Sequence, residues 1–213
     1  MPNPAELGAR PGDVAHVRSD GLYGWAIRRV LRGAWGNHDG IVVYANGQWG
    51  VAEALFREGF VVTPWIEYEA AVLAQSKGVA FLRPRHMPEH MSHVVMMGAM
   101  ELADAHVKYD WRAILEIWAL TAVGAAYHIE REWEWYCSEI VMALHHNAGE
   151  EWDVWKKRMP TPLTTEKRHR AGMLVRVGGF GDEEYVKSFP QQLPTSIVEP
   201  WNTSEEDEAW RDL

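Results

Sequence analysis

The feature that most constrains the fold is a pair of short apolar segments, 39–44 and 48–55, separated by Ala45-Asn46-Gly47. Asn-Gly readily adopts the positive φ angles of a tight two-residue turn, and between apolar runs it is the strongest local signal of a β-hairpin. The two segments are therefore predicted to be neighbouring antiparallel strands. The apolar patterning predicts further strands at 13–18, 59–65, 79–83 and 173–177.

Helices are predicted where apolar residues recur with helical spacing, and 66–76 is ambiguous between helix and strand. The expected helices span 23–31, 88–107, 111–123 and 137–146. Together these elements predict an α+β fold, a small and mostly antiparallel sheet or barrel packed against helices. A chain of 213 residues has room for one such domain, here 1–187. The remaining 188–213 are rich in proline and acid, and this tail is expected to be extended or disordered.

Cys137 is the only cysteine in the chain, so no internal disulfide is available to the fold. It directly precedes the apolar-periodic run 140–144, which places it in the first turn of the predicted helix. Unpaired backbone N–H groups and the positive end of the helix dipole favour a thiolate at that position. Cys137 is therefore a candidate nucleophile.

A nucleophilic thiol needs a nearby imidazole to take its proton, and the imidazole needs a third polar group to orient it. His38 opens the first hairpin strand and is the candidate base. Glu53 interrupts an apolar run in the second strand, where a hairpin allows it to lie beside His38 on one sheet face. Asp39 is a second carboxylate next to the histidine, so the orienting group stays open between Glu53 and Asp39.

Five short motifs occur in an order that resembles a known family. They are Gly12-Asp13, His38-Asp39-Gly40-Ile41, Val51-Ala52-Glu53-Ala54, Tyr109-Asp110 and Tyr136-Cys137-Ser138-Glu139. Over roughly 11–180 the chain resembles the circularly permuted, papain-like NlpC/P60 superfamily, and within it the YiiX/YaeF-like group. The resemblance implies a permuted papain-like fold and a cysteine hydrolase that needs no cofactor. It assigns Cys137 as nucleophile, His38 as base and acid, and Glu53 as orienter.

The resemblance leaves the substrate open between a peptide-type amide, as for a cysteine peptidase or amidase, and a lipid or thioester acyl group with hydrolysis or transfer. A non-catalytic binding module that keeps the fold is the other alternative. Trp133, Trp135 and Tyr136 immediately precede the cysteine, and with Asp39 they are candidate substrate-binding residues. Core packing explains the three aromatic residues equally well.

No metal site is predicted. His86, His90 and His93 have the i, i+4, i+7 spacing of one helix face, but Pro84 and Pro88 interrupt that segment. The net charge of −9 disfavours nucleic acid or an anionic membrane as a partner.

The sequence shows no signal peptide, and its longest apolar stretch, 114–126, is too short to span a bilayer. A cytoplasmic protein without stable membrane insertion is therefore expected. The sequence makes no prediction of the oligomeric state.

Overall fold

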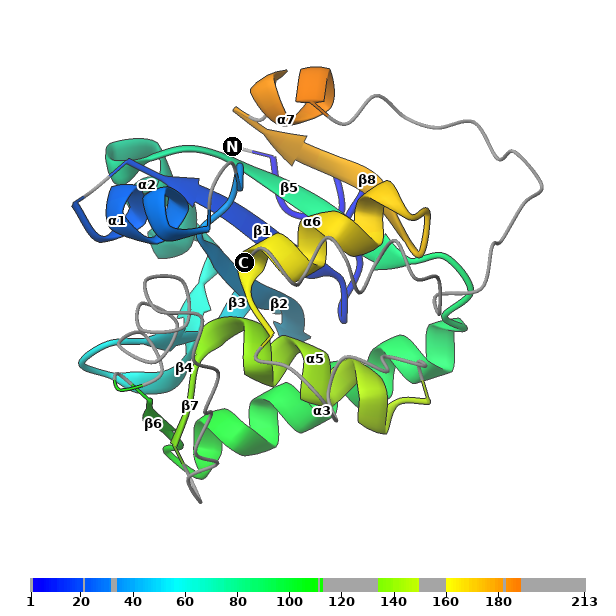
Figure 1. Cartoon of the computed structure of the whole chain (residues 1–213). Coiled ribbons are helices and arrows are strands. Elements are labelled where there is room, and N and C mark those ends of the chain that lie inside the picture. The colour runs from blue at the N-terminus through cyan, green and yellow to red at the C-terminus, as the bar shows by residue number, and fades with distance from the viewer. Residues whose placement is uncertain are drawn as a thin grey trace, which may run out of the picture.

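A computed structural model describes residues 2–20, 22–31, 34–110, 112, 134–149, 160–181 and 183–188. Within these residues the main feature is a six-stranded sheet in which every neighbouring pair is antiparallel, with strand order β4-β3-β2-β1-β5-β8 (Figure 1). The strands are β1 (Val14–Ser19), β2 (His38–Ala45), β3 (Gln48–Leu55), β4 (Gly59–Pro64), β5 (Ser76–Pro84) and β8 (Leu174–Phe180). The predicted α+β class and antiparallel sheet are confirmed.

Helices pack on both faces of this sheet. They are α1 (Leu22–Val30), α2 (Trp65–Gln75), α3 (Glu89–Asp104), α5 (Cys137–Asn147), α6 (Pro162–Arg170) and α7 (Glu183–Ser188). Two short strands, β6 (Lys108–Tyr109) and β7 (Glu134–Trp135), pair in parallel beside the main sheet. Helices α3 and α5 lie side by side on one side of the sheet, and α2 lies on the other (Figure 1).

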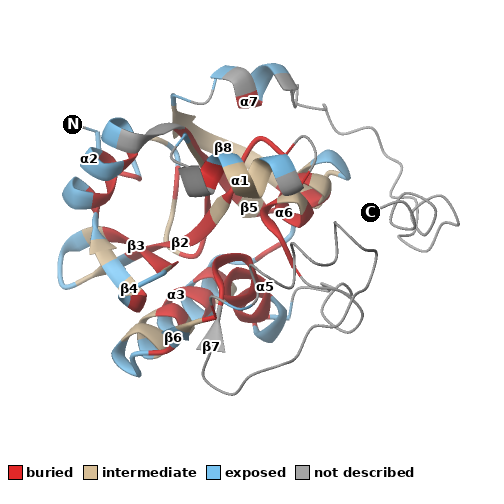
Figure 2. Cartoon of the chain, turned by 60° about the vertical axis from the view of Figure 1, so that its left-hand side comes forward, coloured by how far each residue is buried: buried red, intermediate tan, exposed pale blue. Residues whose placement is uncertain are grey.

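Alternation along the strands creates two apolar cores. Ile41 and Val43 of β2 belong to the core shared with α3 and α5, whereas Val42 between them belongs to the core shared with α2. Helix α5 is the most deeply placed helix, because all nine residues from Cys137 to His145 are buried (Figure 2). The helix that carries the cysteine is therefore fixed along most of its length.

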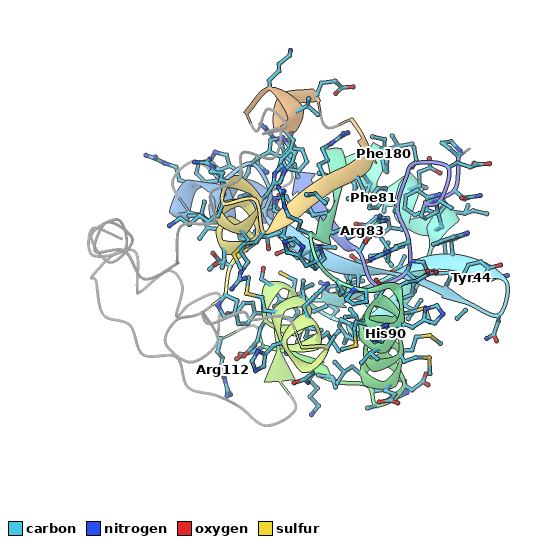
Figure 3. The ribbon with its side chains drawn as sticks, turned by 90° about the vertical axis from the view of Figure 1, so that its right-hand side faces the viewer. Tyr44, Phe81, Arg83, His90, Arg112 and Phe180 are labelled. Atoms are coloured by element: carbon cyan, nitrogen blue, oxygen red, sulfur yellow. The ribbon has the colours of Figure 1, made fainter. Side chains whose placement is uncertain are left out.

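The predicted hairpin forms with a two-residue turn. Ala45 pairs with Gln48, and the residues between them, Asn46 and Gly47, have φ of 54° and 79°. Positive φ at both positions is what the Asn-Gly pair was expected to supply. Tyr44, beside this turn, extends away from the helices at the far end of the hairpin (Figure 3).

The start of β1 explains one of the sequence motifs. Gly12 has a φ of 89°, and a Cβ atom there would lie 2.5 Å from the backbone oxygen of Ser92 on α3. Only glycine fits this close approach of β1 to α3. The buried Asp13 carboxylate then accepts two hydrogen bonds of 2.8 Å from the Arg83 guanidinium on β5, so the Gly12-Asp13 pair serves the fold.

Some predicted elements differ from the structure, and others lie outside the described residues. The ambiguous segment 66–76 is helix α2 up to Gln75, and β5 begins at Ser76. Helices α6 and α7 were not predicted. The expected helix at 111–123 and the tail beyond Ser188 lie almost wholly outside the described residues; Arg112 is helical and Ser188 ends α7. No helix among the described segments has the length and apolar character needed to cross a bilayer.

Candidate active site

The hairpin register brings His38 and Glu53 together. Gly40 of β2 pairs with Glu53 of β3, so His38, two residues earlier, lies diagonally across from Glu53 on the same face. His38 Nε2 is 3.0 Å from Glu53 Oε2. The other carboxylate oxygen, Oε1, accepts a 2.7 Å hydrogen bond from the hydroxyl of Thr63 on β4. Three adjacent strands therefore contribute one line of interacting polar side chains.

The thiol of Cys137 lies on the other side of the His38 ring. Burial alone would lower the pKa of His38. The charge of Cys137 and a hydrogen bond with it outweigh burial, with a further contribution from Glu53, and together they raise the pKa well above its ordinary value. Because Glu53 contacts Nε2, Nδ1 is the ring nitrogen left for an interaction with the sulfur. Cys137 is 7% exposed and the His38 side chain is 20% exposed, so the imidazole is the more accessible of the two. The structure thus brings together the three residues predicted to form the site.

The charge of Cys137 affects the pKa values of two tyrosines. The pKa of Tyr109 is raised first by burial and then by the nearby charge of Cys137. The pKa of Tyr136 is raised by burial, then by Glu139 and Cys137. Both phenols therefore stay protonated at neutral pH. Tyr109, which also packs edge-on against Phe56, was not assigned to the site from sequence.

Asp39 does not contact the solvent-accessible part of the site. Its side chain is fully buried, and its oxygens accept hydrogen bonds from His16 Nδ1 at 2.6 Å, Ser138 Oγ at 2.7 Å and Thr165 Oγ1 at 3.0 Å. A carboxylate with these partners is not free to bind a substrate or to orient His38. Of the two carboxylates considered from sequence, Glu53 contacts His38, whereas Asp39 points to the opposite face of β2.

The predicted aromatic substrate-binding residues are only partly described. Trp133 lies outside the described residues, and of Trp135 only the backbone, in β7, is described. Tyr136 is 2% exposed and immediately precedes α5. Its backbone N–H is 3.4 Å from Glu139 Oε2, so this carboxylate binds back onto the start of the helix. Tyr136 is therefore buried in this structure and presents little surface to a substrate.

The three histidines with helical spacing do not share a helix. His86 lies in a turn, and α3 begins only at Glu89, so it carries His90 and His93 but not His86. His90 lies exposed on α3 (Figure 3). Over the ranges that the structure describes, no group of three or more histidine, cysteine or acidic side chains has an arrangement that could hold a metal ion.

A buried charged cluster next to the site was missed by the sequence analysis. It is centred on His16 of β1, whose Nδ1 contacts Asp39 and whose Nε2 is 3.3 Å from Glu166 Oε1 on α6. Burial lowers the pKa of His16, but the charges and hydrogen bonds of Asp39 and Glu166 raise it to about 9. His16 is therefore an imidazolium at neutral pH. The sequence signal that could have indicated this cluster is His16 itself, a histidine between the apolar residues Ala15 and Val17 of a predicted strand, which needs a polar partner when it is buried.

His16 is expected to make the free energy of unfolding depend on pH. An unfolded histidine titrates near 6.5 and folded His16 near 9, so its stabilisation is complete below pH 6.5 and is lost as the pH rises through about 9. The difference corresponds to about 3 kcal/mol. Urea unfolding at intervals from pH 6.5 to 9.5 measures this loss.

The variant His16→Gln separates this effect from the titration of His38, whose raised pKa acts in the same direction. The slope against pH should flatten in His16→Gln and stay unchanged in the control His90→Gln, an exposed position on α3. Burial lowers the pKa values of His145 and His169 to about 4, so their effect on stability lies between about pH 4 and the unfolded value near 6.5. It is largely complete by about pH 7.5, below the pH at which His16 loses its stabilisation. An unaltered slope in His16→Gln would contradict the assignment.

Comparison with known proteins finds similarity among solved structures. No protein-family model matches the sequence, and no curated protein matches it. Among solved structures, the chain is similar to the crystal structure of the metalloprotein YiiX from Escherichia coli O157:H7, with 18% sequence identity and a TM-score of 0.46. The match covers 91% of this chain and 99% of that chain. A likeness of this size carries no functional argument, and the fold class follows from the strand order and helix packing of this chain.

Proposed function

We propose that the protein is a cysteine hydrolase that cleaves an amide or acyl-ester bond through a covalent acyl-enzyme. The observation that carries the proposal is the position of His38 between Cys137 and Glu53, which raises the pKa of the imidazole. A raised imidazole pKa favours the thiolate–imidazolium pair that a cysteine nucleophile requires. Glu53, held in turn by Thr63, orients the ring and stabilises its positive charge.

In the acylation step the Cys137 thiolate attacks the carbonyl carbon, forming a C–S bond and a tetrahedral oxyanion. Collapse of this intermediate breaks the bond to the leaving amine or alcohol, which takes the proton held by His38. In deacylation His38 removes a proton from water as the water oxygen attacks the thioester carbon. The C–S bond then breaks, which releases a carboxylic acid and restores the thiolate and the imidazolium.

The oxyanion needs hydrogen-bond donors close to the sulfur. The backbone N–H of Cys137 lies in the first turn of α5, where N–H groups have no partner within the helix. This N–H is the oxyanion donor that we propose, because it lies at the start of the helix that carries the sulfur.

The motif order supports assignment to the permuted papain-like NlpC/P60 superfamily. The histidine strand precedes the cysteine helix in the chain, as the resemblance of the sequence implies for this group. In the described structure β2 and β3 supply the histidine and the acid, and α5 supplies the cysteine from a distant part of the chain. This arrangement is compatible with the permuted fold and requires no cofactor.

The thiol itself provides a test that needs no substrate. Alkylation of Cys137 by iodoacetamide is expected to stay fast well into the acid range, because the imidazolium of His38 stabilises the thiolate. Removing the charge of the orienter in Glu53→Gln should move the rate profile toward alkaline pH. The rate is measured by intact-mass spectrometry between pH 5.5 and 9, and each molecule takes up one label because the chain has one cysteine.

Glu58→Gln is the matched control, because Glu58 is exposed in the turn that follows β3. Its alkylation profile should match that of the unmodified protein. A wild-type profile with its midpoint near 8.5, the value of an isolated thiol, would contradict an activated nucleophile. Such a profile would favour the alternative of a binding module that retains the fold.

The class of substrate requires a direct comparison of turnover. Para-nitrophenyl esters of increasing chain length test for a lipid or thioester acyl hydrolase, and short peptide amides test for a peptidase or amidase. Rising kcat/KM with acyl length would exclude the peptidase form of the proposal. Adding an amine or alcohol acceptor to the same assay distinguishes transfer from hydrolysis.

A further inference from the structure

We infer that Asp39 and Ser138 are positioning residues that hold the start of helix α5 in register with the strand that carries His38. The inference deepens the proposed function and rests on it, because it concerns the same site. Asp39 directly follows His38, and Ser138 directly follows Cys137. The Ser138 hydroxyl donates a 2.7 Å hydrogen bond to Asp39 Oδ2. One bond therefore joins the two backbone segments that carry the reacting side chains.

This hydrogen bond has the properties of a strong one. Ser138 and Asp39 are both 0% exposed, so water does not compete for either group. The contact of 2.6 Å between His16 Nδ1 and Asp39 Oδ1 keeps the acceptor ionised, because a nearby positive charge lowers the pKa of Asp39 against the opposing effect of burial. Hydrogen bonds to a charged acceptor are shorter and about twice as strong as neutral ones.

The carboxylate is itself held from several directions. Thr165 of α6 donates a 3.0 Å hydrogen bond to the same oxygen that binds Ser138. Glu166, the next residue, contacts His16 and also accepts a 2.8 Å hydrogen bond from the backbone N–H of Gly36. A Cβ atom on Gly36 would collide with the His16 ring, so glycine is required for this packing. The cluster thus ties β1, β2, α5 and α6 together at one point.

The other contacts between α5 and the sheet set this register less directly. Most are apolar, as in the core that contains both Ile140 and Ile41, and apolar packing has no directional preference. Hydrogen bonds, by contrast, restrict both distance and angle. The hydrogen bond of 3.1 Å between His145 Nε2 and the carbonyl oxygen of Gly12 is directional, but His145 lies at the other end of α5 from Cys137. Because a misplacement of about 1 Å can reduce a rate by about 100-fold, a directional bond one residue from the nucleophile determines how well the sulfur meets the imidazole.

The test compares Ser138→Ala with the rescue variant Ser138→Thr and the control Ser92→Ala. Ser92 is a matched control because it is also a buried helical serine, 1% exposed, and its hydroxyl has no hydrogen-bond partner among the described residues. Two properties are measured on the folded protein. One is the titration of His38, followed by NMR of labelled histidine and assigned with His38→Gln. The other is the rate of Cys137 alkylation at pH 6.5.

In Ser138→Ala the pKa of His38 should fall toward its ordinary value, and alkylation should slow by about 10- to 100-fold. Ser138→Thr restores the hydroxyl and should restore both properties, while Ser92→Ala should change neither. A hydroxyl that only contributed to stability would lower the melting temperature without moving the His38 titration. Unchanged titration and alkylation in Ser138→Ala would therefore overturn the inference.

A failure of the proposed function gives a different result. If Ser138→Ala moves the His38 titration but the wild-type protein hydrolyses neither esters nor amides, the hydrolase proposal fails and the positioning role stands. Should Ser138→Ala not fold, Thr165→Val removes another hydrogen bond to Asp39 and should shift both properties in the same direction by a smaller amount. No shift in a folded Thr165→Val would then overturn the inference.

Discussion

Replacing Cys137 by alanine is expected to abolish turnover of the best ester or amide substrate, by a factor of about 10⁴ or more. In the proposed mechanism His38 and Glu53, which contact each other, supply only proton transfer and orientation, so neither could replace the sulfur as nucleophile. The fold should tolerate the change. Cys137 lies at the start of α5 and alanine removes a single sulfur atom, so the melting temperature is expected to change little. Initial rates and a thermal melt measure the two effects.

The matched pair for this experiment uses the two glutamates described above. Glu53→Gln should lower kcat because the His38 ring loses its charged partner, whereas the exposed Glu58→Gln should keep wild-type rates. Turnover that persists in Cys137→Ala would rule out the covalent mechanism. A large loss of stability in Cys137→Ala would instead show that the thiol serves the core.

Asp39→Asn is expected to lower the free energy of unfolding by about 3–5 kcal/mol, the usual result of breaking a buried ion pair. Asparagine has no charge to balance His16, and its NH₂ group would face hydroxyl and imidazole donors that now bind the carboxylate. The imidazolium would then be held by Glu166 alone. Urea unfolding at pH 7 measures the loss.

Asp104→Asn is the control, because Asp104 is exposed at the end of α3 and its substitution should change stability by less than about 0.5 kcal/mol. If Asp39→Asn does not fold at 25 °C, Thr165→Val removes one hydrogen bond to the same carboxylate. That variant should cost about 1–3 kcal/mol. A stability within error of wild type in both variants would contradict the energetic importance of the cluster.

Much of the sheet could be predicted because its signals are local. The Asn46-Gly47 turn and the alternating strands on either side fix the hairpin register, and the register in turn places Glu53 diagonally across from His38. The helix at Cys137 followed from an apolar run that ends before Gly149, whose φ is 87°. The contact between the thiol and the imidazole came from the family resemblance and from chemistry, since no local pattern relates residues a hundred positions apart.

Other parts could not be predicted for identifiable reasons. Segment 66–76 mixes alanines, which favour a helix, with β-branched and aromatic residues, which favour a strand. The packing of Trp65, Tyr68 and Val72 against the sheet selects the helix. Helix α6 buries mostly polar side chains, so it lacks an apolar stripe; the Thr161-Pro162 start was its only signal.

The charged cluster was missed because its members come from four elements that are far apart in the sequence, β1, β2, α5 and α6. Asp39 was considered as an alternative orienter and as a substrate-binding residue, and neither role fits its burial. Sequence alternation places residue 39 on the face opposite to residue 38, which argues for a separate partner. The identity of that partner depends on tertiary contacts with His16 and α6, and these have no counterpart in local spacing.

The long separations within the cluster have a consequence for biosynthesis. Asp39 and Ser138 are 99 positions apart, Asp39 and Thr165 are 126 apart, and His16 and Glu166 are 150 apart. Loops of this length close late, after most of the chain has left the ribosome. A chain truncated before residue 166 would therefore lack contacts that align the imidazole with the thiol. In the proposed mechanism, Cys137 would become fully reactive only after the whole domain has been made.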